Sequence, residues 1–149
     1  MGLDYAEPVA TVLIVSDLPA LRAELRATLE GPEIEIDEVE TGRTALDRVR
    51  EGGIDLVITD MQVGSMGGMA ITMEMRNEES YGAAESVPVL MLLDRRADVF
   101  LARRGGADGF LVKPLNPRRV REAVRALLRD ETYEDDSWRP ATVRVGTTE

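Results

Sequence analysis

Two kinds of hydrophobic pattern alternate along the chain. Short, almost continuous apolar runs are typical of buried β-strands, whereas apolar residues three or four positions apart are typical of amphipathic helices. Residues 34–37 alternate apolar and acidic side chains, as expected for a strand with one solvated face. The predicted strands cover residues 9–15, 34–37, 54–59, 87–93 and 110–112.

A segment with helical spacing follows each predicted strand. The first carries a stripe of leucines over residues 18–29, with Asp17 as its predicted N-cap. The last has its apolar stripe over residues 120–128 and Asn116 as its predicted N-cap. The three helices between them are predicted around residues 45–49, 69–75 and 99–102.

Strands that alternate with single helices predict an α/β fold, a doubly wound parallel sheet with helices on both faces. Such sheets place their working residues beyond the carboxyl ends of the strands, an edge that we call the carboxyl rim. Ser16 and Asp17 follow the first predicted strand, and Asp60 follows the third. Asp94 and Lys113 follow the fourth and fifth. We therefore expect several carboxylates and one lysine to meet at this rim.

The composition restricts the chemistry at the rim. The chain has 149 residues and no histidine or cysteine, which excludes histidine-dependent hydrolysis, zinc sites built on those residues and disulfides. Lys113 is the only lysine beside 17 arginines. No apolar run reaches the length of a membrane span, and the first residues do not resemble a secretory signal. We therefore expect a cytoplasmic protein without a membrane partner.

Several stretches, in order and at the right spacing, resemble a response-regulator receiver domain of the CheY-like type over residues 9–129. The resemblance implies a flavodoxin-like fold with a five-stranded sheet of order 2-1-3-4-5, and a part in bacterial two-component phosphorelay signalling. The lysine–proline motif at the end of the fifth strand is the most specific of these stretches. The matching stretches are residues 12–17 with Arg22, 55–60, 88–91 and 105–115.

The resemblance also implies a role for each residue at the rim. Asp60 is the implied phosphoacceptor, which takes a phosphoryl group from the phosphohistidine of a sensor histidine kinase or a phosphotransfer protein. Because a carboxylate that attacks a phosphoryl group meets negative charge, the site needs cations. Lys113 is the implied counter-ion, and its bond to Pro114 is expected to be cis. Asp17, Asp60 and the backbone carbonyl of Gln62 are the implied ligands of a weakly bound Mg²⁺.

Four positions depart from the family pattern or are open to a second interpretation. Ser16 replaces the first acid of the metal-binding pair, so Mg²⁺ affinity should fall. Leu93 replaces a hydroxyl residue that couples phosphorylation to the conformational switch, and a lost charge-assisted hydrogen bond is worth about 1.5–3 kcal/mol. Asp94 adds a carboxylate near the phosphoryl position. Phe110 stands where the family has a switching aromatic residue, although a core phenylalanine is equally consistent with the pattern.

The loop after Asp60 departs as well. Residues 63–68 read VGSMGG, with Gly64 and Gly67 in place of the family's proline and aspartate, so we expect a more mobile loop. Asp60 and Lys113 also have a simpler interpretation as a structural ion pair. We favour a metal- or phosphoryl-binding site, because arginine, which the chain uses everywhere else, would serve an ordinary ion pair.

Charge is distributed unevenly. Residues 1–93 carry a net charge of −12, whereas residues 94–129 have 10 basic and 4 acidic residues, a net charge of +6. The resemblance implies that the face formed by helix 4, strand 5 and helix 5 contacts a protein effector or a second copy of the chain, and a solvated face is the simpler alternative. Nucleic acid is disfavoured because no base-reading motif accompanies the arginines. The arginines assigned to this face are Arg95, Arg96, Arg103, Arg104, Arg118, Arg121 and Arg125.

Three segments are predicted from these patterns: an N-terminal extension (1–8), the receiver domain (9–129) and an acidic C-terminal tail (130–149). A flexible extension is the simpler interpretation of the tail. The alternative is that its acidic run folds onto the chain's own arginines, with Trp138 as an anchor. Twenty residues are too few for an output domain, so we expect a stand-alone receiver.

These observations favour one function and leave others open. The first is an atypical response regulator receiver, not an enzyme, that is phosphorylated at Asp60 and acts by protein contact. The alternative is a pseudo-receiver adaptor that works without phosphorylation, which Ser16, Leu93 and Asp94 favour. A phosphatase of the aspartyl-phosphate type needs a second aspartate two residues after the nucleophile, where this chain has Gln62. A flavin-binding protein is disfavoured because no hydroxyl-rich phosphate loop follows the first strand.

Overall fold

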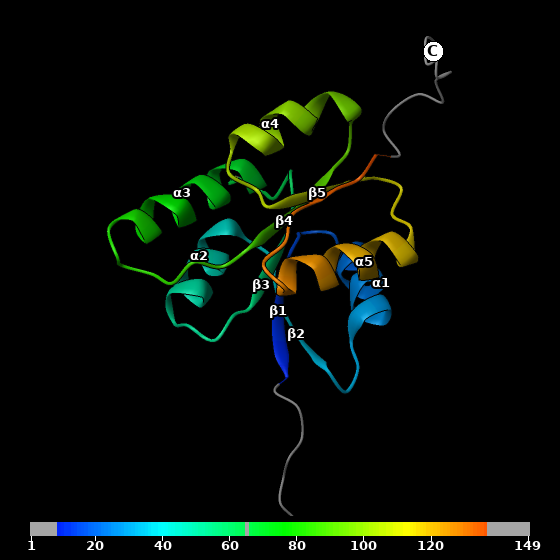
Figure 1. Ribbon diagram of the computed structural model, residues 1–149, viewed down its shortest axis with the longest axis horizontal. Helices are drawn as coiled ribbons and strands as arrows, with labels where there is room; N and C mark the ends of the chain where they lie inside the picture. Colours follow the sequence, from blue (N-terminus) through cyan, green and yellow to red (C-terminus); the bar gives the residue numbers. More distant parts are fainter. Residues whose placement is uncertain (1–8, 65, 137–149) are drawn as a thin grey trace, which may run out of the picture.

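A computed structural model describes residues 9–64 and 66–136, which are built on one parallel sheet (Figure 1). The strand order is β2-β1-β3-β4-β5-β6, so the first five strands have the predicted order. Every neighbouring pair is parallel, which places the carboxyl ends of all the strands at one rim. The strands are β1 (Ala10–Val15), β2 (Ile34–Val39), β3 (Leu56–Asp60), β4 (Val89–Leu93), β5 (Gly109–Val112) and β6 (Tyr133–Glu134).

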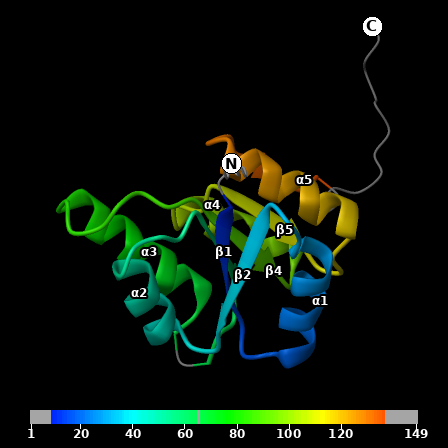
Figure 2. The same ribbon diagram turned by 90° about the horizontal axis from the view of Figure 1, so that it is seen from below.

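Helices cover both faces of the sheet. Helices α1 and α5 lie on one face, and α2 and α3 lie on the other (Figure 2). Within the described residues, no helix is long and apolar enough to cross a membrane. The helices are α1 (Pro19–Leu29), α2 (Gly42–Arg50), α3 (Gly68–Ser80), α4 (Val99–Arg104) and α5 (Pro117–Leu128), with a short 3-10 turn η1 (Arg96–Asp98) before α4.

The two predicted N-caps have different outcomes. The side chain of Asn116 accepts hydrogen bonds from the backbone amides of Arg118 and Arg119 at the start of α5, as predicted. The predicted cap of α1 is wrong, because Leu18 occupies the cap position and no side chain caps this helix. Pro19, which needs no amide partner, occupies the first turn instead. Asp17 is therefore available for another contact.

Alternate residues of the central strands supply two separate cores. Val12 and Ile14 of β1 pack beneath α1 and α5, whereas Leu13 and Val15 pack beneath α2 and α3. Because both faces are covered, the strand is continuously apolar rather than alternating. A third cluster lies beneath α4 and contains Met91, Leu93, Phe110 and Val112 among its members.

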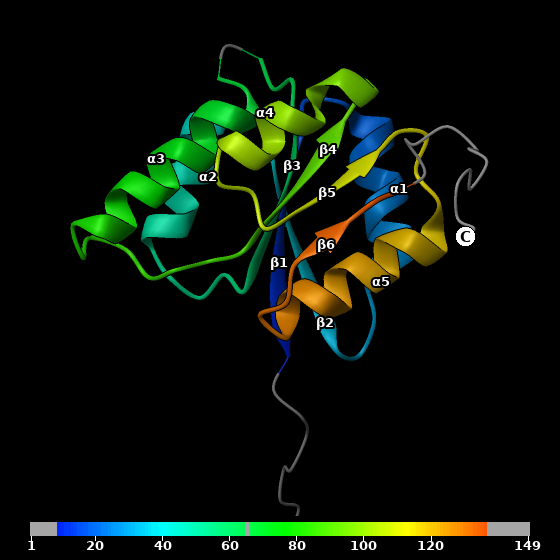
Figure 3. The ribbon, with the colours of Figure 1, turned by 45° about the horizontal axis from the view of Figure 1, so that its top comes forward.

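The sheet has six strands, not the predicted five. β6 pairs with β5 along the sheet edge, with Tyr133 opposite Gly109 (Figure 3). A Cβ atom on Gly109 would lie 2.8 Å from the carbonyl oxygen of Tyr133, so glycine permits this close approach. Residues 133–136, predicted to belong to a tail outside the domain, thus contribute to the fold, while Trp138 lies outside the described residues.

Candidate functional site

Strand register brings the predicted site residues to the carboxyl rim. Val15 pairs with Thr59, so Ser16 and Asp60 lie one residue beyond this pair. Asp60 in turn pairs with Leu92, and the backbone amide of Lys113 donates to the carbonyl of Leu93. The chemistry-bearing side chains of four strands therefore meet at one place, as expected from the parallel topology.

Asp60 is buried with two polar partners. Its side chain is 1 % exposed, and its Oδ1 accepts a 2.8 Å hydrogen bond from the Nζ of Lys113. Its Oδ2 accepts a longer, 3.3 Å bond from the hydroxyl of Ser16. A carboxylate this deeply buried requires a charged partner, and Lys113 supplies it. Lys113 and Pro114 are joined by a cis peptide bond, as predicted.

Lys113 is shared between two carboxylates. Its Nζ also lies 3.0 Å from the Oδ1 of Asp94, whose side chain is 47 % exposed. Burial lowers the pKa of Lys113, but the hydrogen bonds to Asp60 and Asp94 outweigh it and raise the pKa above its ordinary value. The lysine is thus firmly cationic at neutral pH, and Asp94 occupies part of its hydrogen-bonding capacity.

Ser16 contributes hydrogen bonds rather than charge. Its side chain is buried, and its hydroxyl oxygen accepts a 3.1 Å bond from the backbone amide of Leu18. Arg22 donates a 2.7 Å bond to the backbone carbonyl of Ser16 and also pairs with Glu38 on β2. The end of β1 is thereby attached to α1 and β2, which holds the Ser16 hydroxyl beside Asp60.

Asp17 is engaged by the loop that follows Asp60. Its Oδ2 accepts a 3.1 Å hydrogen bond from the backbone amide of Gly64. Gly64 has φ of +49°, a conformation closed to proline, and proline has no amide hydrogen to donate. The replacement of the family's proline by Gly64 therefore creates a contact to the implied metal ligand that the family residue is unable to make.

The donor set at the rim fits a weakly bound Mg²⁺. Asp17, Asp60 and the backbone carbonyl of Gln62 offer oxygen atoms, the ligands that Mg²⁺ prefers, and Mg²⁺ retains several waters when few protein ligands are present. Within residues 9–64 and 66–136, no group of three or more acidic side chains forms a metal site. Ser16 supplies no negative charge, and the Gly64 amide already engages one oxygen of Asp17, so both weaken the site for a cation.

Leu93 and Phe110 belong to the apolar cluster beneath α4. Both side chains are buried, so Leu93 presents no hydroxyl to the rim and Phe110 packs as a core residue. The guanidinium of Arg103 lies 5.8 Å from the centre of the Phe110 ring, within the range of a cation–π contact. Of the two interpretations of Phe110, the structure therefore shows the core phenylalanine, in contact with the cluster beneath α4 and with Arg103 of that helix.

The structure does not bring the seven predicted partner arginines together. Arg95 pairs with Asp98, three residues later, and Arg118 pairs with Glu122 on the same helix. Arg103 pairs with Glu134 of β6. Among the described residues, Arg96, Arg104, Arg121 and Arg125 form no ion pair.

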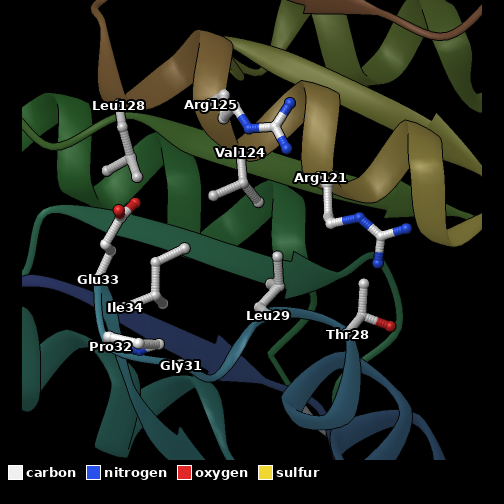
Figure 4. A pocket seen from close by; sticks show the side chains of 10 residues that line it. All are labelled: Thr28, Leu29, Gly31, Pro32, Glu33, Ile34, Arg121, Val124, Arg125 and Leu128. Carbon is white, nitrogen blue, oxygen red and sulfur yellow. The ribbon is translucent and has the colours of Figure 1, made fainter.

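Arg121 and Arg125 line a cavity of about 320 Å³ between α5, α1 and the start of β2 (Figure 4). This cavity is bordered by the amino end of β2 and is therefore remote from the carboxyl rim. The remaining Arg96 and Arg104 lie in η1 and α4 and do not line this cavity.

The sequence prediction missed Arg119. Its Nη1 lies 3.0 Å from Asp135 and 3.3 Å from Asp136, directly after β6. Asp135 is 2 % exposed and also accepts a 3.0 Å bond from the backbone amide of Val112. The excess of acids after residue 129 was the available signal, and it supported the alternative in which the tail folds onto the chain's own arginines.

Comparisons with known proteins agree with this geometry. The family described as response regulator receiver domain matches residues 12–125. The nitrate/nitrite response regulator protein NarP of Escherichia coli is 32% identical over 118 residues, 77% of this chain and 53% of that protein. The DNA-binding response regulator MtrA of Mycolicibacterium smegmatis is 33% identical over 120 residues, 79% of this chain and 50% of that protein. The chain thus spans about half the length of the curated relatives it matches.

Solved structures show the same fold. The chemotaxis response regulator CheY4 of Vibrio cholerae aligns with a TM-score of 0.69 and 28% identity, covering 78% of this chain and 97% of that one. A two-component response regulator of the LuxR family from Aurantimonas sp. SI85-9A1 aligns with a TM-score of 0.75 and 21% identity, covering 87% of this chain and 92% of that one. The second likeness concerns the fold alone.

Proposed function

The chain belongs to the response regulator receiver domain family, a family of signalling modules in two-component systems, and we propose that it is an atypical receiver phosphorylated at Asp60. The phosphoryl donor is the phosphohistidine of a sensor histidine kinase or a phosphotransfer protein, since the chain has no histidine of its own. The signal passes on by contact with an effector protein.

The contact between Lys113 and Asp60 is the observation that carries this proposal. Lys113 holds Oδ1 of Asp60 at 2.8 Å, while Oδ2 has only the longer bond to the hydroxyl of Ser16. In the proposed step Oδ2 attacks phosphorus, a P–O bond forms, and the P–N bond to the donor imidazole breaks with its electron pair leaving on nitrogen. Lys113 then neutralises charge on the transferred phosphoryl group.

Mg²⁺ is the proposed cofactor. Asp17, Asp60 and the carbonyl of Gln62 would hold it, and its contribution would be to neutralise the phosphoryl oxygens during transfer. Binding is weak in this proposal because Ser16 adds no negative charge and Asp17 already accepts a bond from Gly64.

A pseudo-receiver adaptor is the second candidate, and the shared lysine favours it. Asp94 holds the Nζ of Lys113 at 3.0 Å, and Asp60 is 1 % exposed. Leu93 packs in the cluster beneath α4, so a hydroxyl contact to a phosphoryl group is missing at this position. In this candidate the fold is fixed in one state and partners recognise it without phosphorylation.

Intact mass after incubation with acetyl phosphate and Mg²⁺ separates the two candidates. We expect the mass of one phosphoryl group on the native chain and none on an Asp60→Asn variant. If the native chain gains no phosphoryl mass at any accessible concentration of donor and Mg²⁺, phosphorylation is contradicted and the pseudo-receiver adaptor is favoured. NMR titration with BeF₃⁻ then asks whether amides of α4 and β5 respond, as an effector-switching receiver requires.

A further inference from the structure

We propose that the outer edge of β5 is a binding site for an extended acidic peptide of an effector protein, filled by the chain's own residues 133–136 until that peptide displaces them. We call these residues the C-terminal strand segment. The inference names the effector chemistry and rests on the proposed effector contact, but not on phosphorylation of Asp60.

The site takes a peptide backbone by strand addition. The amide of Tyr133 donates to the carbonyl of Asp108, and the amide of Asp135 donates to the carbonyl of Phe110, both at 3.2 Å. The amide of Val112 donates 3.0 Å to the side chain of Asp135 rather than to a backbone carbonyl. Hydrogen bonds to the backbone hold the strand without regard to most side chains, whereas the bond from Val112 selects an acid at one position.

Side chains from two helices complete the site. Arg103 on α4 donates two hydrogen bonds to Glu134, at 3.2 and 2.7 Å. Arg119 on α5 faces Asp135 and Asp136, and these acids raise its pKa above the ordinary value. The two arginines therefore flank the edge of β5 and fit acidic residues at three consecutive positions of a peptide.

Tyr133 adds an aromatic contact at the start of the segment. Its ring packs against the core beneath α1 and α5, and its hydroxyl donates 3.2 Å to Glu122. Gly109, which leaves room for the carbonyl of Tyr133, makes the edge accessible to a backbone at this point. The peptide pattern is therefore an aromatic residue followed by three acids.

The segment is short enough to be exchanged. Its strand comprises two residues, and its contacts with Arg103 involve half-exposed side chains that add little stability. A tethered segment has an effective concentration of about millimolar order. A partner peptide with the same intrinsic affinity for the edge competes once its local concentration exceeds this value. A peptide that binds more tightly competes at a correspondingly lower concentration.

Fluorescence anisotropy with a labelled peptide tests the proposal on the full chain. The probe is the hexapeptide ETYEDD, the sequence of residues 131–136. An Asp135→Asn variant weakens the chain's own segment, so we expect it to bind the probe about tenfold or more tightly than the native chain does. Equal binding by both chains, or no binding by either, overturns the proposal.

Two matched variants locate the probe. In the Asp135→Asn background, Arg119→Gln should abolish probe binding, whereas Arg121→Gln should leave it unchanged, because Arg121 lies on the same helix but lines the cavity beside α1. Equal losses in both variants, or a probe ETYEND that binds as well as ETYEDD, contradict the site. A concentration-dependent dimer of the Asp135→Asn chain that excludes the probe identifies a second copy as the occupant and also overturns it.

A second measurement covers the case in which Asp135→Asn does not fold. On the native, ¹⁵N-labelled chain, millimolar ¹³C-labelled probe should give intermolecular NOEs to the amide of Val112, and their absence overturns the proposal. All measurements omit phosphodonor. If the chain binds the probe but gains no phosphoryl group, only the proposed phosphorylation is contradicted. If it gains a phosphoryl group but does not bind the probe, only this inference is contradicted.

Discussion

Two cation–carboxylate clusters occupy adjacent positions at the end of β5. At the carboxyl rim Lys113 pairs with buried Asp60 and exposed Asp94. At the sheet edge Arg119 pairs with buried Asp135 and with Asp136, which is 72 % exposed. Each cluster thus combines one cation, one buried acid and one exposed acid, although only the first contains the proposed phosphoacceptor.

The two clusters differ in which groups donate hydrogen bonds to the buried carboxylate. Asp60 has only side-chain donors, the ammonium of Lys113 and the hydroxyl of Ser16, whereas Asp135 also accepts from the backbone amide of Val112. A side-chain donor can rotate towards a competing acceptor, whereas the position of a backbone amide in a strand is fixed by the sheet. The donors around Asp60 are therefore all side chains, whereas the edge of β5 offers a fixed backbone amide to whichever acidic residue occupies that position.

Removal of Lys113 should have the largest effect on this comparison. We expect Lys113→Met to lower the free energy of unfolding by about 3 kcal/mol at pH 7, because it leaves the buried Asp60 carboxylate without a cation. Urea unfolding measures the loss, and the double variant with Asp60→Asn should recover most of it. A loss below about 1 kcal/mol would mean that Asp60 needs no charged partner.

Removal of Arg119 should cost less. We expect Arg119→Met to lower the free energy of unfolding by about 1 kcal/mol, since Asp135 retains its bond from the Val112 amide. Urea unfolding measures this, and hydrogen exchange at Val112 should accelerate. Arg118→Met is the control and should change neither quantity appreciably. If Arg119→Met cost as much as Lys113→Met, the backbone donor would not distinguish the clusters.

The two exposed acids should differ in function rather than in stability. Asp94→Asn and Asp136→Asn should each change the free energy of unfolding by less than about 1 kcal/mol. Asp94→Asn should also speed phosphorylation by acetyl phosphate, because it removes a competitor for Lys113. Time-resolved intact mass compares the two variants, and equal rates would assign Asp94 no influence on the rim.

Raising the pH to alkaline values should distinguish the two clusters without any substitution, because only the lysine loses its charge. The pKa of Lys113 is raised in the folded protein. Its stabilising contribution is therefore fully present below its pKa in the unfolded chain, about 10.4, and is lost as the pH rises through its pKa in the folded protein. Arg119 stays charged over the same range. The ¹³Cε shift of Lys113, the only lysine, reports its titration directly, and a midpoint below 10 would contradict the assigned contacts.

Strands β1, β3, β4 and β5 were predictable because each buries an almost continuous apolar run. The edge strand β2 was predictable because its apolar and acidic residues alternate. Residues 133–134 carry no such pattern, and β6 exists through pairing with β5 and through arginines distant in sequence. A two-residue strand has no periodicity of its own, so its acidic composition favoured a flexible tail. The structure corrects that expectation for residues 133–136.

The candidate site was only partly predictable. A spacing pattern is sufficient to place Asp60 and Lys113 at one rim, because parallel strands fix where their ends meet. The bond from Gly64 to Asp17 depends on a positive φ and an exposed amide, which no residue pattern encodes. Similarly, the charge of residues 94–129 does not reveal that Arg119 faces β6 while Arg121 and Arg125 face α1.

The parallel direction of β6 has a mechanical consequence. β1 begins at the amino end of the sheet, and β6 leads residue 136 towards the carboxyl end (Figure 3). Tension applied between residues 9 and 136 is therefore directed along the strands and loads the β5–β6 hydrogen bonds in shear, all of them together. A sideways pull on residue 136 would instead open them one at a time, so the same segment resists one direction of load and yields to another.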